Sequence, residues 1–405
     1  MTSPGRDFWN FYTAGRIVFG SGSVARLGAL VKPWSVRRLI LISDRVLERA
    51  GVVAAVREPL IRDGYEVSLF LEGAPEPSYA TAQRAIDQAM AERPEGVIGI
   101  GGGSNLDLSK IVAAALAHGG RFREFASYGN VPGPVLPLAC IPTTAGTGSE
   151  VSHAAVLTDT EQQIKVSFLS QHLRPKLALV DPRLTVSCPA KPTADSGIDA
   201  LTHAIEAYTC VDFDKLAVPA EEPFPYDGKN PLGDCLAERA IELIGRHLVT
   251  AVREPGHLAA REGMALAAML AGLAFSNCAV AAVHALEYPL GGALHCSHGA
   301  GNGLLLPYVM RYNLPARRRE TARIAQLLGE DTAELTEEEA ANQAISRVES
   351  LRKEIGIPER IRELGGTRSQ LPEFARKAFQ IKRLMRLNAR EPSEADLLDI
   401  LEAAY

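Results

Sequence analysis

Short apolar runs recur in the first half of the chain and alternate with longer stretches that have helical spacing. The runs are rich in Val, Ile and Leu, as in strands that are buried on both faces of a sheet. Strands that alternate with helices indicate a mostly parallel sheet covered by helices on both sides. We predict strands at residues 16–19, 38–43, 66–71, 96–100, 135–141 and 177–180.

Helical periodicity fills the gaps between these strands at residues 44–63, 79–92 and 105–117, and residues 155–157 and 165–168 suit a hairpin around Asp159. From about residue 189 onward the pattern changes, and helical windows dominate to the C-terminus. The prolines at 189 and 192 suit a boundary. We therefore expect two domains, an α/β domain at residues 1–188 and a helical domain at residues 189–405.

One segment interrupts the helical half. Residues 211–234 are largely polar and contain four prolines, Pro219, Pro223, Pro225 and Pro231. This is too long for an ordinary connection between helices, so we interpret it as a lid or an interface loop.

Composition narrows the class of protein. Of the 405 residues 46% are hydrophobic and 22% are charged, which is typical of a soluble globular protein. The net charge is −5 without a basic block, so we expect no nucleic-acid partner. The N-terminus lacks the pattern of a signal peptide, and no apolar run reaches about 18 residues. We expect a cytoplasmic protein without a membrane partner. The six cysteines lack CxxC spacing, which is typical of reduced thiols.

The stretch DSGIDALTHAIEAYTC carries the clearest candidate chemistry. Asp199 and His203 are four residues apart in a helical window, so both project from one helix face. They could provide half of a metal site, and His284 and His298 in AVHALEYPLGGALHCSHGAGNG are the leading candidates for the other half. Alternatively, Asp199 and His203 form an ordinary surface pair and His284 is a core histidine. Three imidazoles and one carboxylate suit Fe²⁺ or Zn²⁺.

A run of three glycines follows the predicted strand at 96–100 and opens a helix. Gly102, Gly103 and Ser104 lie where backbone N–H groups at a helix N-terminus can hold a pyrophosphate. The run is not a GxGxxG motif, and the alternative is a tight structural turn.

Asp44 ends the first long strand, at a position where a carboxylate can accept a hydrogen bond from an adenosine ribose. In that role its charge would repel a 2′-phosphate and favour NAD over NADP. An N-cap of the following helix is the alternative.

The segment PTTAGTGSEV follows the strand at 135–141 and is rich in small hydroxyl residues. Thr143, Thr144 and Thr147 would lie at the carboxyl end of a strand, where open α/β sheets bind ligands. A polar loop with a helix cap is the alternative, but the hydroxyl groups exceed what a cap needs.

The order of these segments resembles that of the iron-type (group III) alcohol dehydrogenases, which are related to dehydroquinate synthase and glycerol dehydrogenase. The resemblance covers nearly the whole chain through six motifs: GRIVFGSGSV, IGIGGGSNLDLSK, PTTAGTGSEV, LALVDPRLT, GIDALTHAIEAY and HGAGNGLLLPYVMRYN. It implies an α/β Rossmann-like N-terminal domain and an all-α C-terminal domain, the dehydroquinate synthase-like fold.

The resemblance also implies functional positions. The metal ligands of that family correspond to Asp199, His203, His284 and His298. The positions that contact the cofactor correspond to Asp44, Gly102, Gly103, Ser104, Asp107, Thr143, Thr144, Thr147 and Lys165. The expected activity is hydride transfer between an alcohol or aldehyde and NAD, with Fe²⁺ favoured and Zn²⁺ possible, in a homo-oligomer.

Several positions depart from the family pattern. Tyr288 stands where many members carry a further His, and a phenol with a pKa of about 10 relays protons poorly at neutral pH. Glu76 stands where Asn is common. Together with residues 211–234, Tyr288 is similar to the hydroxyacid-oxoacid transhydrogenase branch, which retains its nicotinamide cofactor. The candidate catalytic residues are Lys165, which could orient the substrate or a cofactor hydroxyl, and Tyr288. Transhydrogenation is the alternative function.

Two further functions are compatible with the fold. An eliminating synthase of the dehydroquinate type would share it, but TTAGTGSE and GIDALTHAIEAY resemble the dehydrogenase branch. A non-catalytic NAD-binding protein would have little use for four metal-ligand positions.

Overall fold

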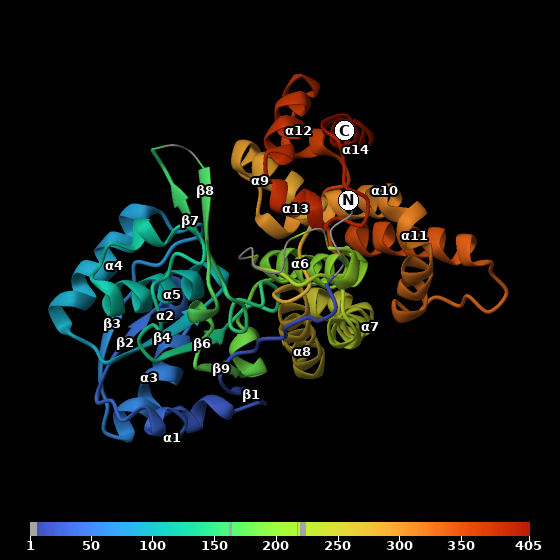
Figure 1. Cartoon of the computed structure of the whole chain (residues 1–405). Coiled ribbons are helices and arrows are strands. Elements are labelled where there is room, and N and C mark those ends of the chain that lie inside the picture. The colour runs from blue at the N-terminus through green and yellow to red at the C-terminus, as the bar shows by residue number, and fades with distance from the viewer. Residues whose placement is uncertain (1–5, 162–163, 217, 219–223) are drawn as a thin grey trace. The chain divides into compact units, whose positions relative to one another are not determined.

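The computed structural model describes residues 6–161, 164–216, 218 and 224–405. They form two compact units (Figure 1). One unit is Tyr12–Cys188, and the other is Pro189–Tyr405 together with the N-terminal segment up to Phe11. That segment was expected in the α/β domain, but Arg6 and Asn10 donate hydrogen bonds of 3.1 and 3.3 Å to Asp227 of the helical unit.

The α/β unit is built on a six-stranded sheet in which every pairing is parallel. The strand order is β1 (Ile17–Phe19), β9 (Leu177–Val180), β6 (Leu138–Pro142), β4 (Gly96–Gly101), β2 (Arg38–Ile42) and β3 (Glu66–Phe70). The six predicted strands are thereby confirmed. Because the strands are parallel, the loops after β2, β4 and β6 leave the same edge of the sheet.

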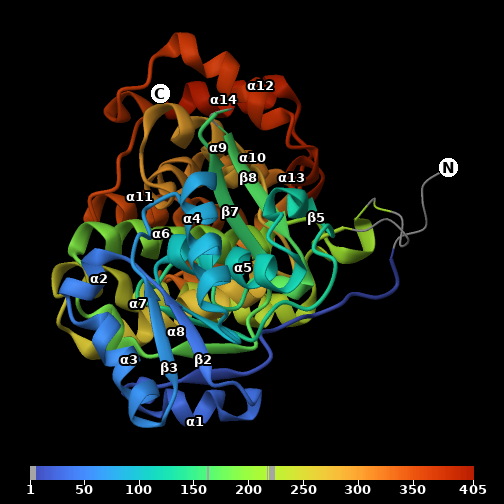
Figure 2. The same cartoon turned by 90° about the vertical axis from the view of Figure 1, so that its left-hand side faces the viewer.

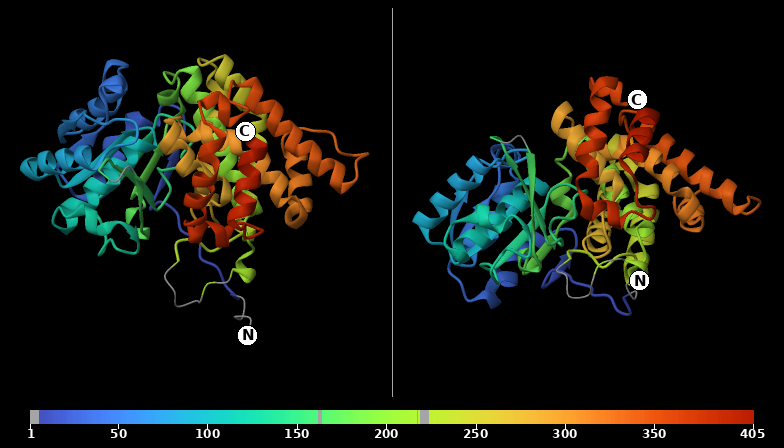
Figure 3. Two further views of the ribbon diagram at one scale, coloured as in Figure 1. Left: turned by 90° about the horizontal axis from the view of Figure 1, so that it is seen from above. Right: turned by 45° about the horizontal axis from the view of Figure 1, so that its top comes forward.

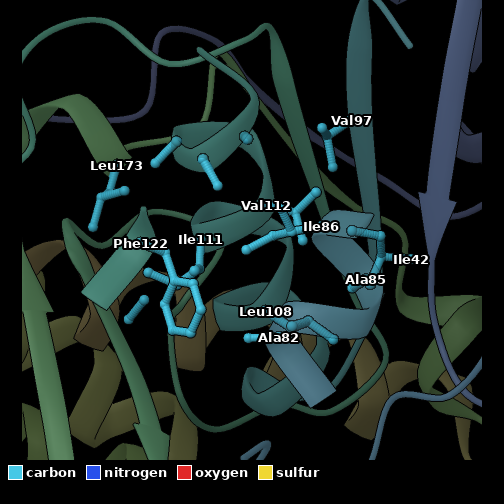
Figure 4. Close-up of a cluster of buried hydrophobic side chains, with 14 of the residues drawn as sticks. Ile42, Ala82, Ala85, Ile86, Val97, Leu108, Ile111, Val112, Phe122 and Leu173 are labelled. Atoms are coloured by element: carbon cyan, nitrogen blue, oxygen red, sulfur yellow. The ribbon is translucent and has the colours of Figure 1, made fainter. Parts of the chain in front are cut away.

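Helices cover both faces of this sheet, as the apolar runs predicted. α4 (Tyr79–Glu92) and α5 (Gly103–His118) lie over one face, and α1 (Leu27–Val31) and α3 (Val52–Arg62) over the other (Figures 1 and 2). Successive residues of β2 alternate between the two cores: Ile40 and Ile42 pack toward α4 and α5, while Leu39 and Leu41 pack toward α1 and α3. Figure 4 shows the first core, where Ile86 of α4 and Val112 of α5 lie together.

The predicted helix at 44–63 forms as two pieces, α2 (Arg45–Arg49) and α3, because Gly51 adopts a φ of 78° between them. The predicted hairpin forms from β7 (Ala154–Asp159) and β8 (Ile164–Leu169), which pair antiparallel. β5 (Ser127–Tyr128) extends it into a three-stranded sheet.

The described residues of the second unit form helices joined by loops, without a β-strand. Its α-helices are α6 (Ala190–Thr209), α7 (Pro231–Arg253), α8 (Leu258–Phe275), α9 (Ala282–Leu294), α10 (His298–Leu327), α11 (Glu337–Glu354), α12 (Leu371–Phe379), α13 (Lys382–Leu387) and α14 (Glu394–Ala404). α10 and α11, orange in Figure 3, pack side by side. α11 begins with a capping box of Thr336 and Glu339.

Within the described ranges, α8 is long and apolar enough to cross a membrane, with a mean hydropathy of 1.4. However, 72% of its window is buried inside the protein, as expected for a core helix. In the polar segment at 211–234, Pro219 and Pro223 lie outside the described residues. The end of this segment is held by backbone hydrogen bonds, from Asp227 to Asn277 and from Gly228 to Cys278.

α6 is the central helix of the unit and is buried over most of its length. Its last carbonyl groups are satisfied by Arg317, which lies where α10 departs from helical geometry. The Arg317 guanidinium donates to the carbonyl oxygens of Thr209 at 3.2 Å and Cys210 at 2.5 Å. Arg317 therefore caps α6, whose helical end would otherwise leave buried acceptors without partners.

Arg317→Met should lower the free energy of unfolding by about 2–4 kcal/mol, because two buried carbonyl groups lose charged donors. Urea-induced unfolding followed by circular dichroism would measure this change. The matched control is Arg318→Met, since the Arg318 side chain is 48% exposed in a 3.8 Å ion pair with Glu338; its effect should stay within about 0.5 kcal/mol. Equal stability of the two variants would contradict the capping role.

Candidate metal centre and nucleotide-binding loops

Asp199 and His203 project from one face of α6 into the interior, with exposed fractions of 2% and 5%. Their separation of four residues places His203 Nδ1 3.9 Å from Asp199 Oδ2. The alternative of an ordinary surface pair is thereby excluded. The imidazole of His203 stacks on Phe275 at 4.2 Å and on His284 at 4.8 Å between ring centroids.

Three of the four predicted metal ligands come together in the helical unit. One ligand atom from each of Asp199 (α6), His284 (α9) and His298 (α10) lies within 4.8 Å of the other two. His203 adjoins this group through its stacking on His284. The backbones of α6 and α10 also approach closely at Gly299, because a Cβ there would lie 1.9 Å from the carbonyl oxygen of Asp195 on α6. Glycine at 299 thus lets the start of α10 reach Asp199.

Asn302, one turn after His298, marks the point on which these ligand atoms converge. Its Nδ2 lies 2.8 Å from Asp199 Oδ1, 3.1 Å from His298 Nε2 and 3.2 Å from His284 Nε2. Its Oδ1 is buried and has no hydrogen-bond partner among the described residues. Three acceptors that face one point suit a cation. Sequence reasoning missed Asn302, although its spacing of four from His298 could have indicated it.

Two buried glutamates contact the outer nitrogens of the imidazoles. Glu206 Oε2 lies 2.5 Å from His284 Nδ1, and Glu206 Oε1 accepts from Val283 N at 2.7 Å. Glu287 Oε2 makes the corresponding contact with His298 Nδ1. With a proton on each Nδ1, both Nε2 atoms are free to act as ligands. The sequence analysis missed both glutamates, although each lies three residues after a candidate histidine.

Asp199 is poised to stay ionised. Burial acts against its charge, but the imidazoles of His203, His298 and His284 and the hydrogen bond from Asn302 lower its pKa overall. One carboxylate with neutral imidazoles is a donor set that divalent iron and zinc accept. The residues therefore fit a divalent transition metal.

Tyr288 stacks on His298, with 6.0 Å between ring centroids. Burial raises the pKa of its phenol to about 12, and Arg383 offsets this only in part. Tyr288 therefore keeps its proton at neutral pH, so its hydroxyl group can donate a hydrogen bond but does not act as a base.

In the α/β unit, the two predicted nucleotide loops lie against each other. Gly102 is the N-cap of α5, and Gly103 is its first residue. A Cβ at Gly103 would lie 2.7 Å from Thr147 Cγ2, and one at Gly102 would lie 3.5 Å from Thr144. The absence of side chains on both glycines keeps the backbone N–H groups at the start of α5 accessible, which suits an anionic group.

Ser104 and Lys165 join this cluster through Glu76. Ser104 Oγ accepts from Glu76 N at 3.2 Å, and Lys165 Nζ forms a 2.8 Å ion pair with Glu76 Oε1. Glu76 has a φ of 51°, in the left-handed region where Asn is more common than Glu.

Two of the predicted cofactor residues have structural tasks. Asp44 is the N-cap of α2: its Oδ1 accepts from Val46 N and Leu47 N, and its Oδ2 accepts from Asn105. The N-cap alternative is therefore correct, and the ribose contact stays a prediction. Asp107 accepts from Ser149 Oγ at 2.6 Å and from Val156 N at 2.9 Å, which ties α5 to the second loop and to β7.

Glu150 lies at the end of the second loop and is 3% exposed. Burial raises its pKa from 4.5 to about 7, with the nearby Lys110 opposing the shift. Lys110 is itself buried and donates to Ser152 Oγ and to the carbonyl oxygen of Ala154. Burial lowers the pKa of Lys110, against the attraction of Asp107.

Comparisons with known proteins agree on one family. The model of the family described as iron-containing alcohol dehydrogenase matches residues 14–182. The model described as the C-terminal part of the Fe-containing alcohol dehydrogenase family matches residues 193–405.

Individual relatives match over nearly the full chain. The chain is 38% identical over 403 residues to long-chain-alcohol dehydrogenase 1 of Geobacillus thermodenitrificans, covering 96% of both proteins. It is 33% identical to the NAD-dependent methanol dehydrogenase of Bacillus methanolicus, covering 92% of this chain and 93% of that protein. The crystal structure of a 1,3-propanediol oxidoreductase is similar with a TM-score of 0.92 at 33% identity, covering 98% of this chain and 100% of the other.

The raised pKa of Glu150 gives the α/β unit a testable dependence on pH. Because the pKa of Glu150 is higher in the folded than in the unfolded state, binding of its proton stabilises the fold. This contribution is complete below about pH 4.5 and is lost as the pH rises through about 7. Glu150→Gln removes the titrating group. The melting temperature of this variant minus that of the parent protein should therefore be larger at pH 8 than at pH 5.

Differential scanning calorimetry at both pH values would measure this difference. The control is Glu349→Gln, which removes a carboxylate that is 32% exposed and paired with Arg311. A relative melting temperature of the Glu150 variant that does not change with pH would contradict the burial effect.

Proposed function

The chain belongs to the iron-containing alcohol dehydrogenase family, and on this premise we propose that it transfers a hydride between an alcohol or aldehyde and NAD at a divalent metal. It is an oxidoreductase, as the members of that family are. The proposed metal ligands are Asp199, His203, His284 and His298. The observation that carries this proposal is that ligand atoms of Asp199, His284 and His298 lie within 4.8 Å of one another.

A divalent metal in such a site polarises the substrate oxygen and lowers the pKa of a bound alcohol. Glu206 and Glu287 keep a proton on the Nδ1 atoms of His284 and His298, which directs both Nε2 atoms inward. The lowered pKa of Asp199 keeps that ligand anionic. Fe²⁺ is favoured by the family, and Zn²⁺ is compatible with the same nitrogen and oxygen donors.

For NAD we propose the loops of the α/β unit. The N-terminus of α5 at Gly102, Gly103 and Ser104 would bind the pyrophosphate, because its N–H groups are accessible. The remaining proposed cofactor contacts are Asp44, Asp107, Thr143, Thr144, Thr147 and Lys165. Lys165 could orient a cofactor hydroxyl or the substrate, with Glu76 fixing the ammonium group at 2.8 Å.

Tyr288 contributes by shape and by its phenolic hydrogen rather than as a base. Its pKa of about 12 means that the phenol remains protonated across the neutral range. Its ring lies against that of His298, so we propose that it lines the substrate pocket.

The transhydrogenase alternative still rests on Tyr288 and residues 211–234, and it is not specifically supported by the relatives, which are alcohol dehydrogenases by name. It predicts hydride transfer to a paired acceptor such as 2-oxoglutarate without net release of NADH. A homo-oligomer and a cytoplasmic location likewise stay predictions.

NADH absorbance with a panel of alcohols and aldehydes, alongside metal analysis, tests the function. We expect NADH formation that needs bound metal, and His284→Ala should abolish both metal and activity while the circular dichroism spectrum is unchanged. The control is His172→Ala in the other unit, which should retain both. Full metal content with retained activity in the His284 variant would refute its assignment as a ligand. Turnover only after 2-oxoglutarate is added would favour the transhydrogenase.

Asp44 should set the preference for NAD over NADP. Asp44→Asn removes the charge but keeps an oxygen that can cap α2, whereas Asp44→Gly removes both. Each variant should raise the NADPH to NADH ratio of kcat/KM at least about tenfold, because repulsion of the 2′-phosphate is lost. The Gly variant should also have a free energy of unfolding lower by about 0.3 kcal/mol. An unchanged ratio in both would disprove the ribose role.

A further inference from the structure

We propose that Glu287 is a positioning residue for the metal centre, which fixes the ring of His298 and tightens its hold on the metal. This inference rests on the proposed metal site. The carboxylate contacts His298 Nδ1, the nitrogen that points away from the convergence point. The other nitrogen, Nε2, lies 3.9 Å from Asp199 Oδ1 and 3.1 Å from Asn302 Nδ2.

His298 depends on such a contact more than the other histidines do. Its side chain is 32% exposed, whereas the side chains of His284 and His203 are 3% and 6% exposed. His284 is also confined by ring stacking on His203 and by Glu206. His298 is the first residue of α10, and its ring contacts the rings of Tyr288 at 6.0 Å and His284 at 5.3 Å, neither of which is a hydrogen bond to Nδ1. A hydrogen-bond partner at Nδ1 therefore adds to these ring contacts, and it also fixes which nitrogen carries the proton.

The position of Glu287 is built into the surrounding chain. Its side chain is fully buried, and two glycines leave the space that it occupies. A Cβ at Gly291 would lie 2.2 Å from Glu287 Oε1, and one at Gly301 would lie 2.8 Å from Glu287 Cγ. Because Gly291 follows Glu287 on α9 and Gly301 follows His298 on α10, each helix supplies one wall of the space.

Burying a carboxylate costs several kcal/mol unless a partner compensates its charge. A carboxylate that accepts from an imidazole N–H makes the opposite nitrogen a stronger metal ligand, and it fixes the tautomer. Glu206 and His284 form the same arrangement, with a contact of 2.5 Å. The centre thus has two carboxylate–imidazole pairs, Glu206 of α6 with His284 of α9 and Glu287 of α9 with His298 of α10.

The test measures metal affinity directly. The full-length protein is stripped with a chelator, and Co²⁺ is then titrated against a chromophoric chelator. Glu287→Gln keeps the shape and an acceptor but removes the charge, and Glu287→Asp keeps the charge but shortens its reach. Both should weaken Co²⁺ binding about 10–100-fold, the usual effect of losing such a partner. The visible spectrum of bound Co²⁺ should also shift.

Two controls separate positioning from stability. Glu206→Gln should weaken binding to a similar extent through His284, whereas Glu150→Gln removes an equally buried carboxylate from the other unit and should leave the affinity unchanged. Melting temperatures of the metal-free proteins report any structural effect. A lower melting temperature of the Glu287 variants with parental Co²⁺ affinity would overturn the inference.

The outcome also distinguishes this inference from the proposed function. If the parent protein binds no Co²⁺, the proposed metal site itself is wrong. If the parent binds Co²⁺ and both Glu287 variants bind it equally well, the metal site stands and only the role of Glu287 is refuted. Should the Gln variant fail to fold, the Asp variant decides.

Discussion

The burial of an ionised carboxylate, Asp199, is the constraint on which the helical unit depends. A carboxylate with 2% exposure is tolerated because three imidazoles and one amide lower its pKa. These partners come from α6, α9 and α10, so the three helices must approach closely at one level. Gly299 permits that approach, and Arg317 secures the end of α6.

The α/β unit solves a related problem with backbone groups instead of side chains. A parallel sheet brings the ends of β2, β4 and β6 to one edge, where the N-terminus of α5 presents N–H donors. The charged residues around this edge mostly hold the loops in shape. Asp44 caps α2, and Asp107 joins α5 to β7. A residue of a binding loop can thus be needed to hold the shape of that loop. Its substitution can lower activity without the residue contacting the cofactor.

Membership of the iron-containing alcohol dehydrogenase family defines the class of reaction, and two residues of α9 shape the surroundings of one proposed metal ligand, His298. The aromatic ring beside His298 is a phenol with a pKa of about 12, and the adjacent residue, Glu287, is a buried carboxylate. Both residues lie on one turn of α9 and contact the same imidazole.

The amino-acid sequence by itself determined where strands and helices follow one another along the chain, because apolar periodicity and glycine positions are local properties. It also nominated Asp199 and His203 through their spacing on one helix, and the glycine loop through its position after a strand. Only the tertiary structure decided which distant residues complete these sites. The spacing of Glu206, Glu287 and Asn302 from the candidate histidines is a weak local signal that many ordinary helical residues share. Their roles arise from contacts across as many as 103 positions in the sequence. Likewise, Asp44 was compatible with a cap or a ribose contact until the hydrogen bonds to Val46 and Leu47 established the cap. Burial and long-range contact depend on how helices pack, and no single segment of a chain specifies that packing.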